Sequence, residues 1–127
     1  MKIRFLNSKL HGLLDYAAAA GLIALPVVLG FDGSAMWLSV LGGLGLIAYS
    51  LITDYAFGSV SLISFKTHLI LDLSAAAAFI GAPFVFGWSG FVMAYYFVMA
   101  AGVIVVVAVT DPVLDPATNA SLVKASG

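Results

Sequence analysis

Residues 9–15 read KLHGLLD, and residues 66–72, at an offset of 57 positions, read KTHLILD. Lys, His, Leu and Asp recur at the same spacing, and the alignment continues without a gap, so that 17 of the 46 positions in residues 9–54 match their counterparts. Pro26 falls on Pro83, and Thr53-Asp54 falls on Thr110-Asp111. Shared apolar composition would not place His, Asp, Pro and Thr-Asp at one common offset. The sequence therefore predicts two tandem repeats, at about residues 8–54 and 65–111.

The composition indicates a membrane protein. Of the 127 residues, 63% are hydrophobic and 9% are charged, against about 45–50% and about 25% in an ordinary soluble domain. Crossing the hydrocarbon layer takes about 20 apolar residues per helix, so the chain has room for four spans and little else. We therefore expect an all-α membrane protein, with residues 1–127 forming a single domain in the lipid bilayer.

Several classes of function are excluded by residues that the chain lacks. A net charge of −1 provides no basic surface for nucleic acid. The absence of Cys excludes disulfides, thiolate metal sites and thiol catalysis. No phosphate-binding loop, nucleophile elbow or zinc-protease motif occurs in the sequence. We therefore expect no catalytic activity, and nothing in these patterns calls for a resident cofactor.

Each repeat is predicted to fold as a helical hairpin. The first hairpin has helices at residues 8–30 and 35–53, and the second has helices at residues 65–87 and 91–110. Asn7 and Ser64 are suited to cap the first helix of each hairpin, because their side chains accept backbone N–H groups of the first turn. Pro26 and Pro83 remove one helical hydrogen bond each and are expected to kink those helices near their outer ends.

The remaining segments and the charges predict an orientation. Residues 55–64 are expected to form an interfacial linker, and residues 112–127 a C-terminal tail. All basic residues flank one side of the four-span arrangement, and both hairpin turns lack Lys and Arg. The positive-inside rule therefore places both termini in the cytoplasm, with two parallel-oriented hairpins in the cytoplasmic (inner) membrane. The basic residues are Lys2, Arg4, Lys9, Lys66 and Lys124.

The polar residues of the apolar segments suggest a functional site on the cytoplasmic side. His11 and Asp15 are four residues apart and share one helix face. Residues level with each other across an antiparallel hairpin have numbers with a constant sum, so a turn pairing Phe31 with Ser34 places His11 level with Asp54. A carboxylate within a membrane-spanning segment requires a partner. We therefore predict a polar cluster of His11, Asp15 and Asp54.

The same register predicts a second, equivalent cluster of His68, Asp72 and Asp111. Such clusters either hold the helix ends in register or perform chemistry. Imidazole and carboxylate suit zinc or iron, two His residues can be axial ligands of a haem, and a buried His between acids can handle protons. A transition metal or haem at His11 and His68, or proton handling, therefore remains open as the alternative to a purely structural role.

The pattern of the repeat resembles the SPW-repeat integral membrane proteins. The resemblance covers about residues 9–111 and rests on the His-x-x-x-Asp start, the Pro near the end of an apolar helix, a Gly-aromatic turn and the closing Thr-Asp. The Ser-Pro-Trp triplet itself is replaced by Leu25-Pro26-Val27 and Ala82-Pro83-Phe84, so the chain would be a divergent member. The resemblance implies a small bacterial or archaeal membrane protein of paired helices, without an activity to carry over.

These observations predict a small integral membrane protein of structural or accessory type. We expect it to pack with itself as a homo-oligomer or against a larger membrane complex. A metal, haem or proton-handling protein that uses the duplicated His and Asp residues is the alternative.

Overall fold

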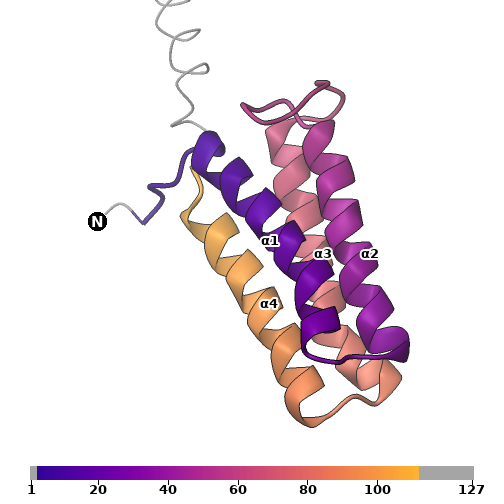
Figure 1. Cartoon of the computed structure of the whole chain (residues 1–127). Coiled ribbons are helices and arrows are strands. Elements are labelled where there is room, and N and C mark those ends of the chain that lie inside the picture. Colours follow the sequence, from indigo (N-terminus) through magenta and orange to yellow (C-terminus); the bar gives the residue numbers. More distant parts are fainter. Residues whose placement is uncertain (1–2, 112–127) are drawn as a thin grey trace, which may run out of the picture.

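The computed structural model describes residues 3–111, which form four antiparallel helices (Figure 1). Each helix has 19–22 residues and is long and apolar enough to cross a membrane, as predicted. Apart from two isolated bridges, the described part of the chain contains no β-structure. The fold is therefore that of an all-α membrane protein, with α1 (Ser8–Val28), α2 (Gly33–Leu51), α3 (Phe65–Phe86) and α4 (Gly90–Val109). The predicted tail, residues 112–127, lies outside the described residues.

The helix starts follow from local sequence. The side chain of Asn7 accepts the backbone N–H of Leu10, and the side chain of Ser64 accepts that of Thr67, so both predicted N-caps are confirmed. These bonds satisfy N–H groups that have no partner within the helix. α1 and α3 therefore begin close to the predicted residues.

The two hairpin turns require glycine. Gly30 and Gly33 flank the first turn with φ values of 74° and 52°, and Gly87 and Gly90 flank the second with 71° and 58°. Residues with a Cβ rarely adopt this left-handed region, whereas glycine adopts it without penalty. Both turns reverse the chain at the same end of the bundle (Figure 1).

Helices pack more closely within each hairpin than between hairpins. In the first hairpin Gly43 of α2 lies against α1 so closely that an added Cβ would be 2.8 Å from the carbonyl oxygen of Ala19.

Two buried tyrosines of α4 join the hairpins on the turn side of the bundle. The Tyr96 hydroxyl donates to Ala35 O at 2.5 Å, and the Tyr95 hydroxyl lies 2.6 Å from Ser39 Oγ.

Pro26 explains the position of Ser39. Proline has no N–H, so Leu22 O loses its normal partner four residues along the helix. Ser39 Oγ of α2 donates to Leu22 O instead, at 2.7 Å. Pro26 and Pro83 both lie inside their helices and are fully buried. A kink at either proline stays a prediction.

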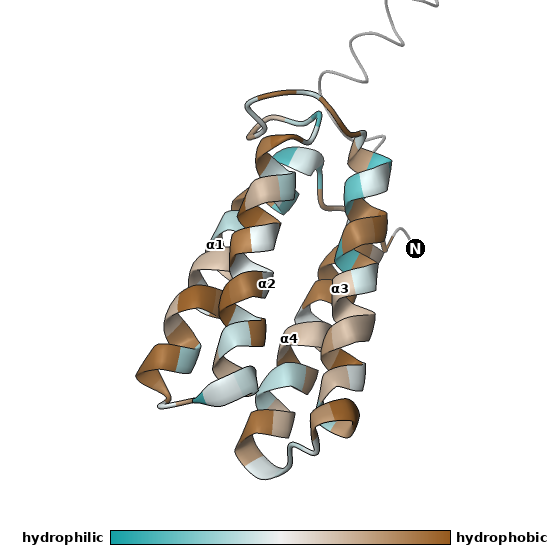
Figure 2. Cartoon of the chain, turned by 90° about the vertical axis from the view of Figure 1, so that its right-hand side faces the viewer, coloured by the Kyte–Doolittle hydropathy of each residue, from teal (hydrophilic) through white to brown (hydrophobic). Residues whose placement is uncertain are grey.

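At the opposite end of the bundle, the segments that precede α1 and α3 pair with the ends of other helices. Phe5 N and Leu6 N donate to Val109 O, which joins the start of α1 to the end of α4. Asp54 N donates to Ile63 O, and Ile63 N to Ile52 O, which joins the start of α3 to the end of α2. Hydrophilic residues gather at this end, whereas the helix surfaces are mainly hydrophobic (Figure 2). We call it the polar end of the bundle.

Candidate functional site

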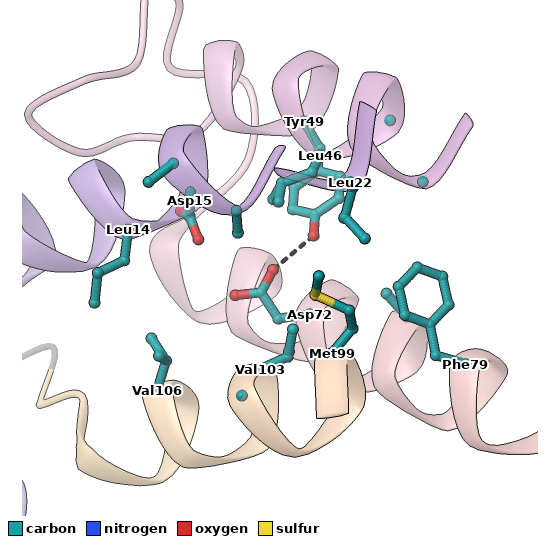
Figure 3. A pocket seen from close by; sticks show the side chains of 16 residues that line it. Leu14, Asp15, Leu22, Leu46, Tyr49, Asp72, Phe79, Met99, Val103 and Val106 are labelled. Atoms are coloured by element: carbon teal, nitrogen blue, oxygen red, sulfur yellow. Dashed lines mark hydrogen bonds between the residues drawn. The ribbon is translucent and has the colours of Figure 1, made fainter. Parts of the chain in front are cut away.

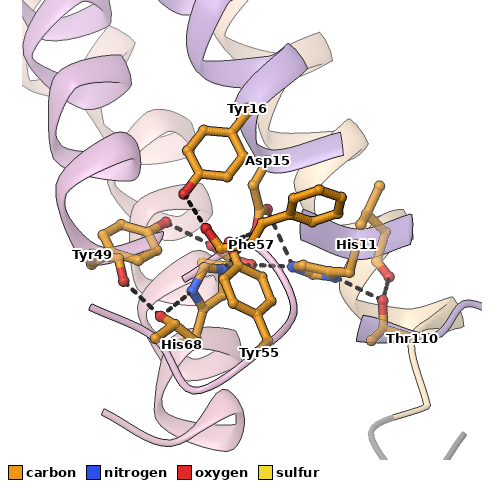
Figure 4. A network of polar contacts seen from close by, with 11 residues as sticks. His11, Asp15, Tyr16, Tyr49, Tyr55, Phe57, His68 and Thr110 are labelled. Carbon is orange, nitrogen blue, oxygen red and sulfur yellow. Dashed lines mark hydrogen bonds and ion pairs between the residues drawn. The ribbon is translucent and has the colours of Figure 1, made fainter. Parts of the chain in front are cut away.

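Two histidines and two aspartates meet inside the polar end of the bundle (Figure 4). His11 and Asp15 come from α1, and His68 and Asp72 come from α3. Both His residues have no exposed surface, and both Asp residues are buried. One ligand atom from each residue lies within 4.8 Å of the other three. We call these four residues the quartet.

Each histidine faces both carboxylates through its Nε2 atom. His11 Nε2 lies 3.2 Å from Asp15 Oδ1 and 3.0 Å from Asp72 Oδ2. His68 Nε2 lies 2.9 Å from Asp15 Oδ2 and 3.5 Å from Asp72 Oδ2. The pairs within one helix are four residues apart, as predicted. The shorter contact of each His crosses between hairpins, so the quartet links α1 to α3.

A threonine hydroxyl determines which nitrogen of each ring carries a proton. Thr110 Oγ1 donates to Val106 O at 2.6 Å and lies 2.8 Å from His11 Nδ1. A hydroxyl has a single proton, so towards His11 it accepts, and Nδ1 must carry the hydrogen. Thr53 Oγ1 repeats this arrangement, donating to Tyr49 O at 2.6 Å and lying 2.8 Å from His68 Nδ1.

This arrangement requires a positive charge at the centre of the quartet. With Nδ1 protonated, a neutral imidazole directs the lone pair of Nε2 at the carboxylate oxygens. Two lone pairs would then face each other at about 3 Å, unless a proton or a metal ion lies between them. His68 Nε2 is buried and has no hydrogen-bond partner among the described residues, although Asp15 lies close by.

Two tyrosines supply further bonds to the carboxylates. The Tyr49 hydroxyl donates to Asp72 Oδ1 at 2.6 Å, and the Tyr55 hydroxyl donates to Asp15 Oδ2 at 3.1 Å. Burial raises the pKa of Tyr55, which lies in the linker between α2 and α3. Its hydroxyl therefore keeps its proton and remains a donor at physiological pH.

The linker covers the quartet at the polar end. The Tyr55 ring lies against His68 and stacks on Phe65, and Phe65 also contacts the edge of His11. The Tyr16 hydroxyl donates to Phe57 O at 2.9 Å and fastens the linker to α1. These aromatic contacts close the histidine side of the quartet.

The predicted contacts of His11 with Asp15 and of His68 with Asp72 are present, but the described residues form one shared quartet instead of two separate clusters. Asp54 is exposed and accepts a hydrogen bond from Ser61 at 3.1 Å. Asp111 is not among the converging residues either. The register argument considered only the two helices of one hairpin, whereas the two hairpins face each other through His11 and His68.

Sequence reasoning missed the residues that orient the quartet. Thr53 and Thr110 belong to the repeated Thr-Asp pair, but only the Asp was assigned to the site. The threonines are buried and precede an exposed and a half-buried Asp. A threonine hydroxyl bonded to the carbonyl four residues earlier keeps an acceptor available for another helix. Tyr49 and Tyr55 gave no signal, because neither has a matching tyrosine in the other repeat.

The spacing of the quartet fits a single metal ion. Zinc binds nitrogen and oxygen ligands at about 2.0–2.2 Å, which separates neighbouring ligand atoms by about 2.9–3.5 Å in octahedral or tetrahedral geometry. Taking one oxygen of each carboxylate, Asp72 Oδ2 lies 3.0 Å from His11 Nε2 and 3.5 Å from His68 Nε2, and Asp15 Oδ2 lies 2.9 Å from His68 Nε2. One ligand atom from each of the four residues lies within 4.8 Å of the others. Nδ1–H groups held by neighbouring oxygen atoms are also typical of metal-binding histidines.

Comparison with known proteins gives no family: no family model matches the chain, and no curated protein or solved structure is significantly similar to it.

Proposed function

We propose that this chain is an integral membrane protein of structural or accessory type, in which one divalent transition-metal ion joins the two hairpins. The ligands are Nε2 of His11 and His68 and one carboxylate oxygen each of Asp15 and Asp72. The observation that carries the proposal is the convergence of four buried ligand atoms from two hairpins within 4.8 Å.

The donor set favours zinc or iron(II). Imidazole suits zinc and iron, whereas magnesium and calcium prefer sites built from oxygen alone. With two neutral imidazoles and two carboxylates, a divalent ion brings the charge of the buried site to zero. This balance matters because an unpaired charge within apolar surroundings is costly.

A haem fits the arrangement less well. Two axial histidines must place their Nε2 atoms on opposite faces of a porphyrin. Here both Nε2 atoms approach the same oxygen, Asp72 Oδ2, at 3.0 and 3.5 Å. A macrocycle between them would have to displace both carboxylates.

Protons on both Nε2 atoms would balance the two carboxylate charges as a divalent ion does. A quartet that holds protons instead of a metal ion is therefore the competing state that the experiment must distinguish.

The expected role of the ion is to hold the hairpins together. Between hairpins the helices pack less closely than within them, so one cross-link at the polar end contributes more than it would inside a hairpin. The large apolar side chains exposed on the helices, among them Trp37, Phe84 and Phe91, then face lipid, a second copy or a larger membrane complex.

We further propose that the hairpins are tandem copies related to the SPW-repeat proteins, with both termini in the cytoplasm. Arg4, Lys9 and Lys66 all lie near the polar end, whereas the described turns carry only Asp32 as a charged residue. Because the chain has no cysteine, orientation can be tested with single cysteines. A cysteine at position 32 should react with an impermeant maleimide added outside intact cells, and one at position 66 should not; the reverse labelling would contradict the orientation.

The metal itself is tested by elemental analysis of protein purified from membranes, with an absorption spectrum to detect haem. Wild type should retain one zinc or iron per chain after dialysis, and Asp72→Asn, which keeps the shape of the side chain, should lose most of it. Asp54→Asn is the matched control, because it removes a nearby acid outside the quartet. Protein that stays metal-free after incubation with excess zinc and iron(II), yet remains folded, would contradict the proposal and support the proton-filled quartet.

A further inference from the structure

An apolar pocket of about 470 Å³ lies between the hairpins, beside the quartet (Figure 3). All four helices contribute to its wall, and most lining residues are apolar. Its size is within the range of about 300–1,000 Å³ that is typical of small-molecule sites. Polar groups are confined to Asp15, Tyr49 and Asp72, so the pocket combines an apolar body with one polar end.

The pocket approaches the quartet from the carboxylate side. Asp15 and Asp72 line it, whereas His11 and His68 do not. The opposite, histidine side is covered by Tyr55 and Phe65. A metal ion held by four protein ligands has further coordination positions if it accepts five or six ligands, as zinc and iron do in open sites. The pocket therefore reaches the two carboxylate residues that would hold the ion.

The net charge of the metal site determines which head groups can bind beside it in the pocket. A divalent ion with two carboxylates and two neutral imidazoles has no net charge, so an anionic ligand would leave a buried negative charge. A neutral oxygen, as in a hydroxyl or carbonyl group, adds a ligand without adding charge. The apolar wall excludes a polar body, because buried polar groups without partners are costly.

We infer that the pocket binds a neutral lipid with an apolar chain and one oxygen-containing head group, and that this oxygen completes the coordination of the metal. This inference rests on the proposed metal site. The chain of the ligand lies among small residues of the wall, including Ala18, Ala75 and Gly102.

The test uses full-length protein in phosphatidylcholine nanodiscs, loaded with Co²⁺, whose visible absorption reports its coordination. Adding 1-dodecanol should change the Co²⁺ spectrum in a saturable manner. Dodecane should leave the spectrum unchanged but compete with dodecanol, and dodecanoate at alkaline pH should bind at least about tenfold more weakly than dodecanol. An unchanged spectrum with dodecanol, or equal binding of dodecanoate, would overturn the inference.

Two glycine variants separate the pocket from the metal. Gly102 lines the pocket and Gly81 does not, and an added Cβ meets nothing within 4 Å at either position. Gly102→Leu should bind Co²⁺ normally and dodecanol about tenfold or more weakly, because the new side chain fills the pocket. Gly81→Leu should behave as wild type. If Co²⁺ does not bind at all, the proposed function fails together with the inference; if Co²⁺ binds but Gly102→Leu responds as wild type, only the inference fails.

Discussion

Replacing Thr110 by valine should weaken metal binding without removing a ligand. Valine has nearly the shape of threonine but cannot accept the Nδ1–H of His11, which now lies 2.8 Å from Thr110 Oγ1. His11 and Thr110 are both fully buried, so no water replaces the lost acceptor. A buried donor without a partner costs about 1–3 kcal/mol. A bound metal fixes the ring, so this cost falls mainly on the metal-bound state.

The expected loss of affinity follows from that cost. Since about 1.4 kcal/mol corresponds to a factor of ten, Thr110→Val should reduce metal affinity about 5- to 150-fold. Substitutions of comparable outer partners typically cost about 10–100-fold, which is consistent with this range. Thr53→Val should have a similar effect, because Thr53 Oγ1 also lies 2.8 Å from its histidine, His68.

Affinity can be measured by competition with a chromophoric chelator in detergent solution, together with helicity by circular dichroism. Thr67→Val is the matched control: Thr67 is exposed and its hydroxyl bonds with Ser64 in the helix cap, so metal affinity should not change. If all three variants bind metal as tightly as wild type does, Thr53 and Thr110 do not orient the histidine rings. If Thr110→Val and Thr67→Val lose affinity together, the effect is one of general stability.

Two further predictions concern packing, and both are measured by thermal unfolding in detergent. Ser39→Ala should cost about 1–3 kcal/mol, because it leaves Leu22 O without a donor and the Tyr95 hydroxyl without an acceptor. In a Pro26→Ala background this cost should shrink, since an alanine at position 26 supplies the missing N–H; equal costs in both backgrounds would refute the explanation. Gly43→Ala should cost about 1–3 kcal/mol because its Cβ would collide with a carbonyl oxygen of α1. Gly81→Ala, where an added Cβ meets no neighbouring atom, should be neutral or stabilising by up to about 1 kcal/mol. If Gly81→Ala destabilises the protein more than Gly43→Ala does, the close contact between Gly43 and α1 is contradicted.

Local features of the fold were predictable from the sequence because each depends on nearby residues. Apolar length predicted four helices, and the side chains of Asn7 and Ser64 predicted where α1 and α3 begin. The short gaps between the predicted helices of each hairpin predicted where the chain reverses, and Gly33 and Gly90 adopt left-handed backbone there. The spacing of His11 and Asp15 also predicted that both side chains lie on one face, where they now contact each other.

Partners across the hairpins were not predictable by the same reasoning. Register within one hairpin placed Asp54 level with His11, but register says nothing about the other hairpin. The segment before α1 pairs with the end of α4 instead, through Leu6 and Val109. That pairing brings Thr110 to His11, whereas Asp54 is exposed and accepts a hydrogen bond from Ser61.

The helices, their caps and turns, and the presence of one His and one Asp at the start of each hairpin follow from local sequence. That these residues form one site rather than two depends on how the hairpins pack, because a buried carboxylate needs compensating charge from whatever lies nearest in space. In this bundle the nearest group to Asp15 is His68, and the nearest to Asp72 among the histidines is His11, each from the other hairpin.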